Sequence, residues 1–295
     1  MATMPSAVVF LSTWHLSPLA LIALVVAAAL YGAGISLAAR RGVRWPLWPA
    51  VRFYALGLGS YSWLCFGFLG AYSEELRWAF TTRLALLLFA VPYLMSLGKP
   101  VALAQAALSG APRAALDRFL ASRFMAVVGN AVFETLFSLA VFLVFLTPFS
   151  GPLRTGRLSE ALITILVPLF GLLMVVPIME DTKKYSGFFI TFEFMLSFAA
   201  LVFDAVPGIL LRLNGIIFDK VAPVVAHVPP WFPTRLRDQQ LSGDLLWFLA
   251  EIADIPVLIV LIVRWSRIDR REARTIDELS DEEMEALTQA HLHRR

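Results

Sequence analysis

The chain has 295 residues, of which 59% are hydrophobic and only 16% are charged, whereas an ordinary soluble domain carries about 25% charged residues. Apolar runs of about 20 residues recur along the whole length, and a run of that length can cross a bilayer as a helix. The formal charge is only +3 and the cations stand in short clusters, so nucleic acid is not an expected partner. The single cysteine, Cys65, excludes an internal disulfide and a CxxC motif.

These runs predict an all-α, polytopic membrane bundle of about seven transmembrane helices over residues 1–270, followed by a short charged cytoplasmic tail over 271–295. The N-terminus lacks a basic region and a convincing cleavage site, so we expect it to be retained. The predicted spans, in chain order, are Ser17–Ala39, Phe53–Ala71, Trp78–Leu97, Phe124–Phe149, Leu158–Met179, Gly187–Leu211 and Asp244–Trp265.

Orientation follows from the loops, because Lys and Arg resist translocation and stay in the cytoplasm. Basic clusters follow the first, third, fifth and seventh predicted spans. The alternate loops hold Arg77 beside Glu74 and Glu75, then Arg154 and Arg157, and a longer stretch with four cations that weakens the contrast without reversing it. The clusters predict an N-terminus outside and a C-terminus in the cytoplasm. Their members are Arg40, Arg41, Arg44 and Arg52; Lys99, Arg113, Arg118 and Arg123; Lys183 and Lys184; and Arg264, Arg267, Arg270, Arg271 and Arg274.

The last predicted span carries an acidic stripe. Asp244, Trp247, Glu251 and Asp254 follow one another at spacings of three, four and three, which places them on one helical face. A charged residue at a span's centre costs roughly 2.5 to 3.5 kcal/mol on insertion scales. The stripe therefore indicates either a cation path inside the bundle or carboxylates that hydrogen-bond to neighbouring helices. Glu134 in the fourth span and Glu193 and Asp204 in the sixth are further carboxylates within predicted spans. Arg83, in the third span, could neutralise one of these acidic groups.

Side chains that could bind copper are spread along the sequence. Cu(I) prefers thiolate and thioether ligands and accepts imidazole, and the candidates are Met174, Met179, Met195, Met95, Cys65 and His15. A methionine in an apolar helix is usually packing, so His15, at the mouth of the first span, is the strongest single candidate. No histidine lies inside a predicted span, which disfavours haem held by paired imidazoles. Nucleophile-elbow, HExxH and phosphate-loop motifs are absent, so we do not expect an enzyme.

Three blocks of sequence resemble the CtaG-type family of cytochrome c oxidase assembly proteins. The first runs from Trp14-His-Leu-Ser-Pro18 through Tyr31 to Ala39-Arg-Arg-Gly-Val-Arg-Trp45. The second is Ala90-Val-Pro-Tyr-Leu-Met-Ser-Leu-Gly-Lys-Pro100, a proline-containing span end before a Leu-Gly-x-Pro turn. The third is Asp238-Gln-Gln-Leu-Ser-Gly243, followed by Leu246, Trp247, Glu251, Pro256 and a basic tail. Their order and spacing cover most of the chain.

One feature departs from that family's pattern. The family commonly carries an HMxxH-like histidine pair in the span before the Leu-Gly-x-Pro turn, and this chain has Trp78-Ala-Phe-Thr-Thr-Arg-Leu-Ala-Leu86 there. The resemblance therefore implies either other copper ligands or a divergent role.

The resemblance implies a non-enzymatic factor in the cytoplasmic (inner) membrane of a bacterium that hands copper to heme-copper oxidase subunits during their maturation. Its functional cavity would be formed by Asp238 and Gln239 at the outer mouth, with Asp244, Glu251 and Asp254 below them; the metal candidates are His15, Met174 and Met179. Two alternatives remain open: a cation or metal-ion transporter that uses the acidic stripe, and a metal-free scaffold for oxidase subunits.

Overall fold

The computed structural model describes residues 6–179, 195, 198–199, 203, 205–219 and 229–277, and the regular structure in this part of the chain is helical. In an apolar surrounding a helix satisfies its own backbone hydrogen bonds, which suits the long apolar runs. Among the described residues, three stretches are long and apolar enough to cross a membrane: Pro18–Arg40, Arg77–Ser96 and Arg157–Val176. They coincide with the first, third and fifth predicted spans.

The first and fifth spans are single helices, α2 (Pro18–Arg40) and α13 (Arg157–Met179). The third is continuous but changes its winding, because a π-helical segment separates two α-helices. Its parts are α6 (Arg77–Ala85), η2 (Leu86–Ala90) and α7 (Val91–Ser96).

The other predicted spans are more interrupted. The second is broken at Gly67, whose extended backbone separates α4 from α5, and the fourth is divided at Gly129–Asn130. Most of the sixth lies outside the described residues, although 205–213 are helical. The elements are α3 (Leu47–Val51), η1 (Arg52–Leu58), α4 (Gly59–Phe66) and α5 (Phe68–Ala71), then α10 (Arg123–Val128) and α11 (Ala131–Val144).

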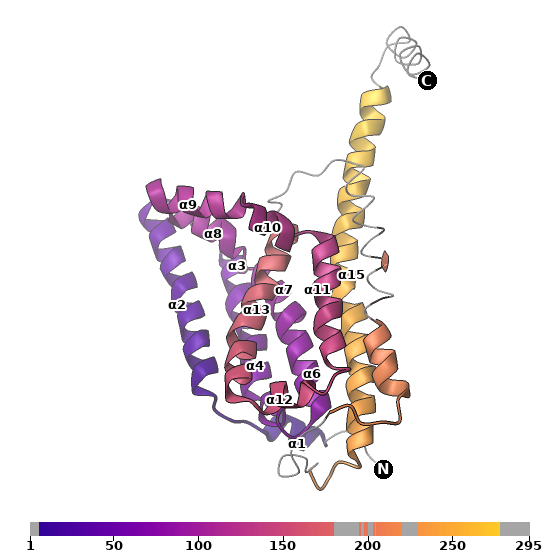
Figure 1. Cartoon of the computed structure of the whole chain (residues 1–295). Coiled ribbons are helices and arrows are strands. Elements are labelled where there is room, and N and C mark those ends of the chain that lie inside the picture. Colours follow the sequence, from indigo (N-terminus) through magenta and orange to yellow (C-terminus); the bar gives the residue numbers. More distant parts are fainter. Residues whose placement is uncertain are drawn as a thin grey trace, which may run out of the picture.

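The seventh predicted span lies within a much longer helix, α15 (Arg235–Asp277), of 43 residues. It runs the length of the bundle and continues beyond it (Figure 1). Two short helices, α1 (Ala7–Ser12) and α12 (Ser150–Thr155), lie at the end where α15 begins. We call this the α12 end. At the opposite end, α8 (Pro100–Ala107) leads into α9 (Gly110–Leu120), which lies across the bundle. We call this the α9 end.

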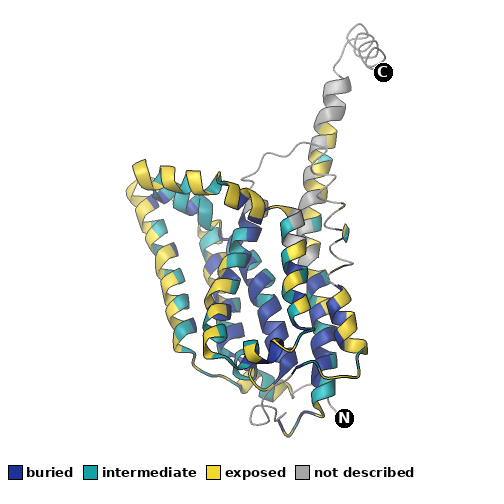
Figure 2. Ribbon diagram, viewed as in Figure 1, coloured by how far each residue is buried: buried dark blue, intermediate teal, exposed yellow. Residues whose placement is uncertain are grey.

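The core is centred on α6. Every residue of α6 is buried, including Arg77 and Arg83, and the burial continues through η2 into α7 (Figure 2). Both α13 and α15 pack against this stretch. By contrast, α2 exposes Ile22, Val25 and Leu30 by 57% or more, as expected of a helix whose surroundings are lipid.

Close backbone contact joins the helices at two places. Pro92 has no N–H for the carbonyl of Leu88, and Gly171 of α13 lies so close that a Cβ there would collide with this carbonyl oxygen. Gly208, in the helix over 205–213, faces Gly243 of α15 in the same way. A Cβ on Gly208 would lie 2.7 Å from the carbonyl oxygen of Gly243 and 2.8 Å from the Cβ of Trp247.

We expect Gly243→Ala to destabilise the protein, because the added Cβ would collide with the carbonyl oxygen of Gly208 and lie 2.9 Å from the backbone nitrogen of Arg212. Backbone atoms cannot rotate away as a side chain can, so the two helices must separate. Overpacking of this kind costs about 1 to 3 kcal/mol. Thermal unfolding in detergent measures the effect. Gly215→Ala is the control, since its Cβ would meet nothing within 4 Å; equal melting temperatures for the two variants would contradict the prediction.

Candidate functional site

Five buried polar side chains gather at the α12 end: Arg77, Arg154, Asp219, Asp238 and Gln239, each at most 5% exposed. We call them the Asp238 cluster. They come from four places in the chain, namely the start of α6, α12, the segment after the 205–213 helix, and the first turn of α15. Buried charges require partners, and the cluster provides them across the bundle.

Asp238 caps a helix to which it does not belong. The residue before α6, Leu76, offers no side-chain cap. Instead, the Asp238 carboxylate accepts hydrogen bonds from the backbone N–H groups of Arg77 at 2.8 Å and Trp78 at 2.9 Å. A carboxylate satisfies the free N–H groups there and meets the positive end of the helix dipole. Burial nevertheless raises the pKa of Asp238 to about 6, against the opposing effect of these hydrogen bonds.

Arg154 and Asp219 form a buried ion pair, with 2.9 Å between Nη2 and Oδ2. Arg154 also donates to the carbonyl oxygen of Glu75 at 3.3 Å, and Arg235 donates to the carbonyl oxygen of Asp219 at 3.1 Å. Burial lowers the pKa of Arg154, and the nearby Asp219 carboxylate opposes that shift. The pair therefore joins α12 to the segment before α15.

The side-chain amide of Gln239 both accepts and donates hydrogen bonds. Its oxygen accepts from Arg77 Nη1 at 3.2 Å and from the backbone N–H of Phe218 at 2.9 Å, while its nitrogen donates to the carbonyl oxygen of Ile216 at 2.8 Å. Arg77 also donates to the carbonyl oxygen of Phe145. The glutamine thereby holds α6, α15 and the 214–219 segment together.

The cluster encloses a cavity of about 10 Å³ lined by its five members and by Glu75, Ile217 and Arg235. That is about the space of one water molecule. Three polar atoms of the cluster, Arg77 Nε, Arg154 Nε and Asp219 Oδ1, are buried without a hydrogen-bond partner. The arrangement suits a structural polar junction rather than a ligand pocket.

A second buried group lies further along α6. Arg83, 1% exposed, makes two hydrogen bonds to Glu160 of α13, at 2.9 and 2.7 Å. It also donates to the Thr164 hydroxyl at 3.1 Å and lies 3.9 Å from the sulfur of Cys65. Glu160 was not among the sequence candidates, because it stands in the first turn of a long apolar run and resembles an interfacial residue. The sequence predicts that Arg83 neutralises a carboxylate of the fourth, sixth or seventh predicted span, whereas in the structure its partner is Glu160.

His15 lies close to this second group. Its backbone N–H donates to the carbonyl oxygen of Phe66 at 2.8 Å, and its Nδ1 is buried without a partner. Burial, reinforced by the charge of Arg83, lowers the pKa of His15. The shift favours the neutral imidazole, the form in which it can bind a metal.

Among the described copper candidates, Met174 lies away from His15. Met174 is buried in α13, 14 residues beyond Glu160 and so about 21 Å further along the helix axis. The side chain of Met179 lies outside the described residues. Within the described part of the chain, no three His, Cys, Asp or Glu residues are grouped so that they could hold a metal ion.

The acidic stripe of α15 lies away from the Asp238 cluster. Asp244 pairs with Arg212 at 3.1 Å, with both side chains more than a third exposed. Glu251 accepts a hydrogen bond from the Trp247 indole, and the side chain of Asp254 lies outside the described residues. At 100° per residue, Asp244 and Glu251 point away from Asp238 and Ser242. Of the residues predicted to form one cavity, Asp238 and Gln239 therefore lie together in the Asp238 cluster, whereas Asp244 and Glu251 lie on the other side of α15.

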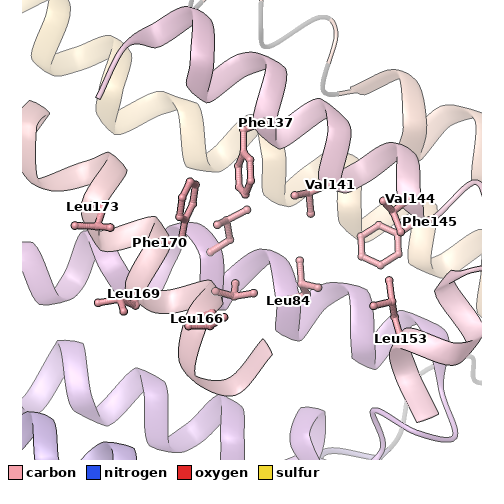
Figure 3. Close-up of a pocket in the computed structure, with 12 residues that line it drawn as sticks. Leu84, Phe137, Val141, Val144, Phe145, Leu153, Leu166, Leu169, Phe170 and Leu173 are labelled. Atoms are coloured by element: carbon pink, nitrogen blue, oxygen red, sulfur yellow. The ribbon is translucent and has the colours of Figure 1, made fainter. Parts of the chain in front are cut away.

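A larger cavity, of about 440 Å³, lies between α6, α11 and α13. All twelve of its lining residues are apolar, and they include Phe137, Val141, Leu166 and Phe170 (Figure 3). Such a lining offers no ligand to a cation.

We expect single charge reversals in the buried pair, Arg154→Asp or Asp219→Arg, to reduce sharply the amount of folded protein in membranes. Each would bury two like charges side by side, which costs at least the roughly 3 to 5 kcal/mol of an unpaired buried charge. The double variant R154D/D219R should recover part of the loss. The same reversals in the exposed pair Arg212 and Asp244 should cost at most about 1 kcal/mol. Quantitative membrane immunoblots measure all of these, and equal losses in the two pairs would refute the assignment.

The raised pKa of Asp238 predicts that the free energy of unfolding depends on pH. Because the folded value is about 6 and the ordinary value is 3.8, the folded protein keeps a proton that the unfolded chain releases between these limits. The free energy of unfolding therefore falls as the pH rises through this window. In D238N this contribution is absent. The stability of the wild type relative to D238N should be greater at pH 5 than at pH 7.5, by on the order of 1 kcal/mol. A difference that is constant with pH would contradict this.

The sequence of the chain is similar to a known protein family and to several mycobacterial proteins. The family model described as cytochrome c oxidase caa3 assembly factor matches residues 29–268, a range that contains the Asp238 cluster and excludes His15. An uncharacterized protein of Mycobacterium bovis and one of Mycobacterium tuberculosis are each 26% identical over 294 residues, and one of Mycobacterium leprae is 25% identical over 286.

Each alignment covers 94% of this chain and 43% of the relative, so the chain spans less than half the length of these relatives. No solved structure shows significant similarity. Since the family model matches well over half of the chain, with all the residues of the Asp238 cluster inside the matched range, the protein belongs to the cytochrome c oxidase caa3 assembly factor family.

Proposed function

We propose that the protein is a non-enzymatic assembly factor that acts on the subunits of a cytochrome c oxidase in the cytoplasmic membrane of a bacterium, and that it assists the supply of copper to them. The observation that carries the proposal is the family match over residues 29–268. This range extends from α2 to α15 and includes both buried polar groups, so the resemblance concerns the whole bundle rather than one motif.

The proposed topology has seven spans, with the N-terminus outside and the C-terminus in the cytoplasm. Its support is the position of the cations. The first two basic clusters meet at the α9 end, where Arg41 donates a hydrogen bond to Ser109. The last part of α15, with Arg267 and Arg270, projects beyond the same end (Figure 1). Gathering of Lys and Arg on one side is the pattern of a cytoplasmic face. The third cluster, Lys183 and Lys184, lies outside the described residues.

Copper would be the cargo of such a factor. The described residues offer it a neutral imidazole at His15 and a buried thiol at Cys65, whereas Met174 lies at a distance from both. Among the residues that the structure describes, no group of three His, Cys, Asp or Glu side chains could hold a metal ion, so we derive no transfer step. Copper supply therefore rests on the resemblance to the family.

A metal-free scaffold is the second candidate, and the Asp238 cluster favours it. All of its charged groups are engaged with the protein itself, and they hold four segments in a fixed arrangement at one end of the bundle. A rigid end surface is what a partner subunit requires.

The transporter alternative gains less support, since Asp244 and Glu251 contact neighbouring side chains and the large cavity is apolar.

A deletion strain grown with limiting and with added copper distinguishes these functions. Copper supply predicts that oxidase activity in membranes is lost at limiting copper and restored by supplementation. A scaffold predicts a loss that copper does not restore, together with co-purification of an oxidase subunit from copper-starved cells. Wild-type oxidase activity in both media would exclude an assembly role and leave ion flux in proteoliposomes as the next measurement.

A further inference from the structure

The α9 end carries an excess of positive charge. Residues 40–52 and 99–123 contain eight Lys and Arg but one acidic residue, Asp117. Asp117 is already engaged, because Arg113 pairs with it at 2.8 Å and the Gln105 amide donates to it at 3.0 Å. The seven other cations are exposed: Arg40, Arg41, Arg44, Arg52, Lys99, Arg118 and Arg123. No acidic side chain in these two stretches remains to neutralise them.

The fold brings the two stretches onto one surface. Arg41, after the end of α2, donates to the Ser109 hydroxyl just before α9. Arg113 of α9 donates to the carbonyl oxygen of Gln105 in α8, so α9 is fixed across the end of the bundle (Figure 1). Cations that are distant in the sequence therefore share one face.

Large apolar side chains are exposed on the same face. Leu47 and Trp48 are 75% and 71% exposed. Phe119 and Phe124, 44% and 49% exposed, have ring centroids 6.3 Å apart. Tryptophan prefers the headgroup level of a bilayer, and a helix that combines cations with such side chains lies in the interface and is attracted to anionic lipid.

We propose that the α9 end binds the headgroups of anionic phospholipids. The charge is complementary, and the site continues directly from the end of α2, a candidate membrane span, so these headgroups are its immediate neighbours. The exposed aromatic side chains enter the acyl boundary while the arginines contact phosphates, for which the guanidinium group is well suited. The proposal depends neither on the role in oxidase assembly nor on which leaflet the α9 end faces.

The test uses the full chain purified in detergent, titrated with phosphatidylglycerol or with phosphatidylcholine of the same acyl chains, with bound lipids counted by native mass spectrometry. The wild type should prefer phosphatidylglycerol, and the preference should weaken with salt. At about 1 kcal/mol per cation, R44Q/R118Q should lower the apparent affinity for phosphatidylglycerol by about 10- to 30-fold. The matched control, R157Q/R237Q, removes two cations near the opposite end and should leave it unchanged.

Thermal unfolding checks the folding of both double variants, and that of R44Q/R118Q should match the wild type because Arg44 and Arg118 are exposed. Equal binding of the two lipids by the wild type would overturn the proposal and would indicate an acidic protein surface as the partner of this face. An equal loss of affinity in R157Q/R237Q would also overturn it, since the binding would then reflect net charge alone.

Discussion

The arrangement of the bundle depends on how the charges at its α12 end are compensated. Asp238 supplies the cap that α6 lacks, and Arg154 with Asp219 joins α12 to the segment that precedes α15. Removal of one partner from a buried pair is far more costly than the net contribution of the pair. These contacts therefore act mainly as a constraint, because alternative placements of α15 would leave charges buried without partners.

The Asp238 cluster and the group around Arg83 both contact α6, at two different positions along its axis. Arg77 and Arg83 are six residues apart on α6, about 9 Å along its axis. The first is tied to α15 through Gln239 and the second to α13 through Glu160. Since α6 is buried along its whole length, it serves as the common element against which both long helices are positioned.

The sequence predicted the first, third and fifth spans well, because long apolar runs between basic clusters are an unambiguous signal. It also singled out Asp238 and Gln239. It could not identify their partners, since Arg77, Arg154 and Asp219 are distant in the chain and meet only when the helices pack. The spacing of Asp244 and Glu251 shows which residues share a face, but helical periodicity does not show what that face meets. The extent of α15 was also underestimated, because its polar ends carry no hydropathy signal.

The length of α15 has a mechanical consequence. Its 43 residues extend for about 65 Å, roughly twice the hydrocarbon thickness of a bilayer at about 30 Å. One end is held by the Asp238 cluster, and the other stands clear of the bundle (Figure 1). The helix is therefore fixed at one end and free at the other. A tilt of a few degrees at the fixed end would move the free end by several ångströms.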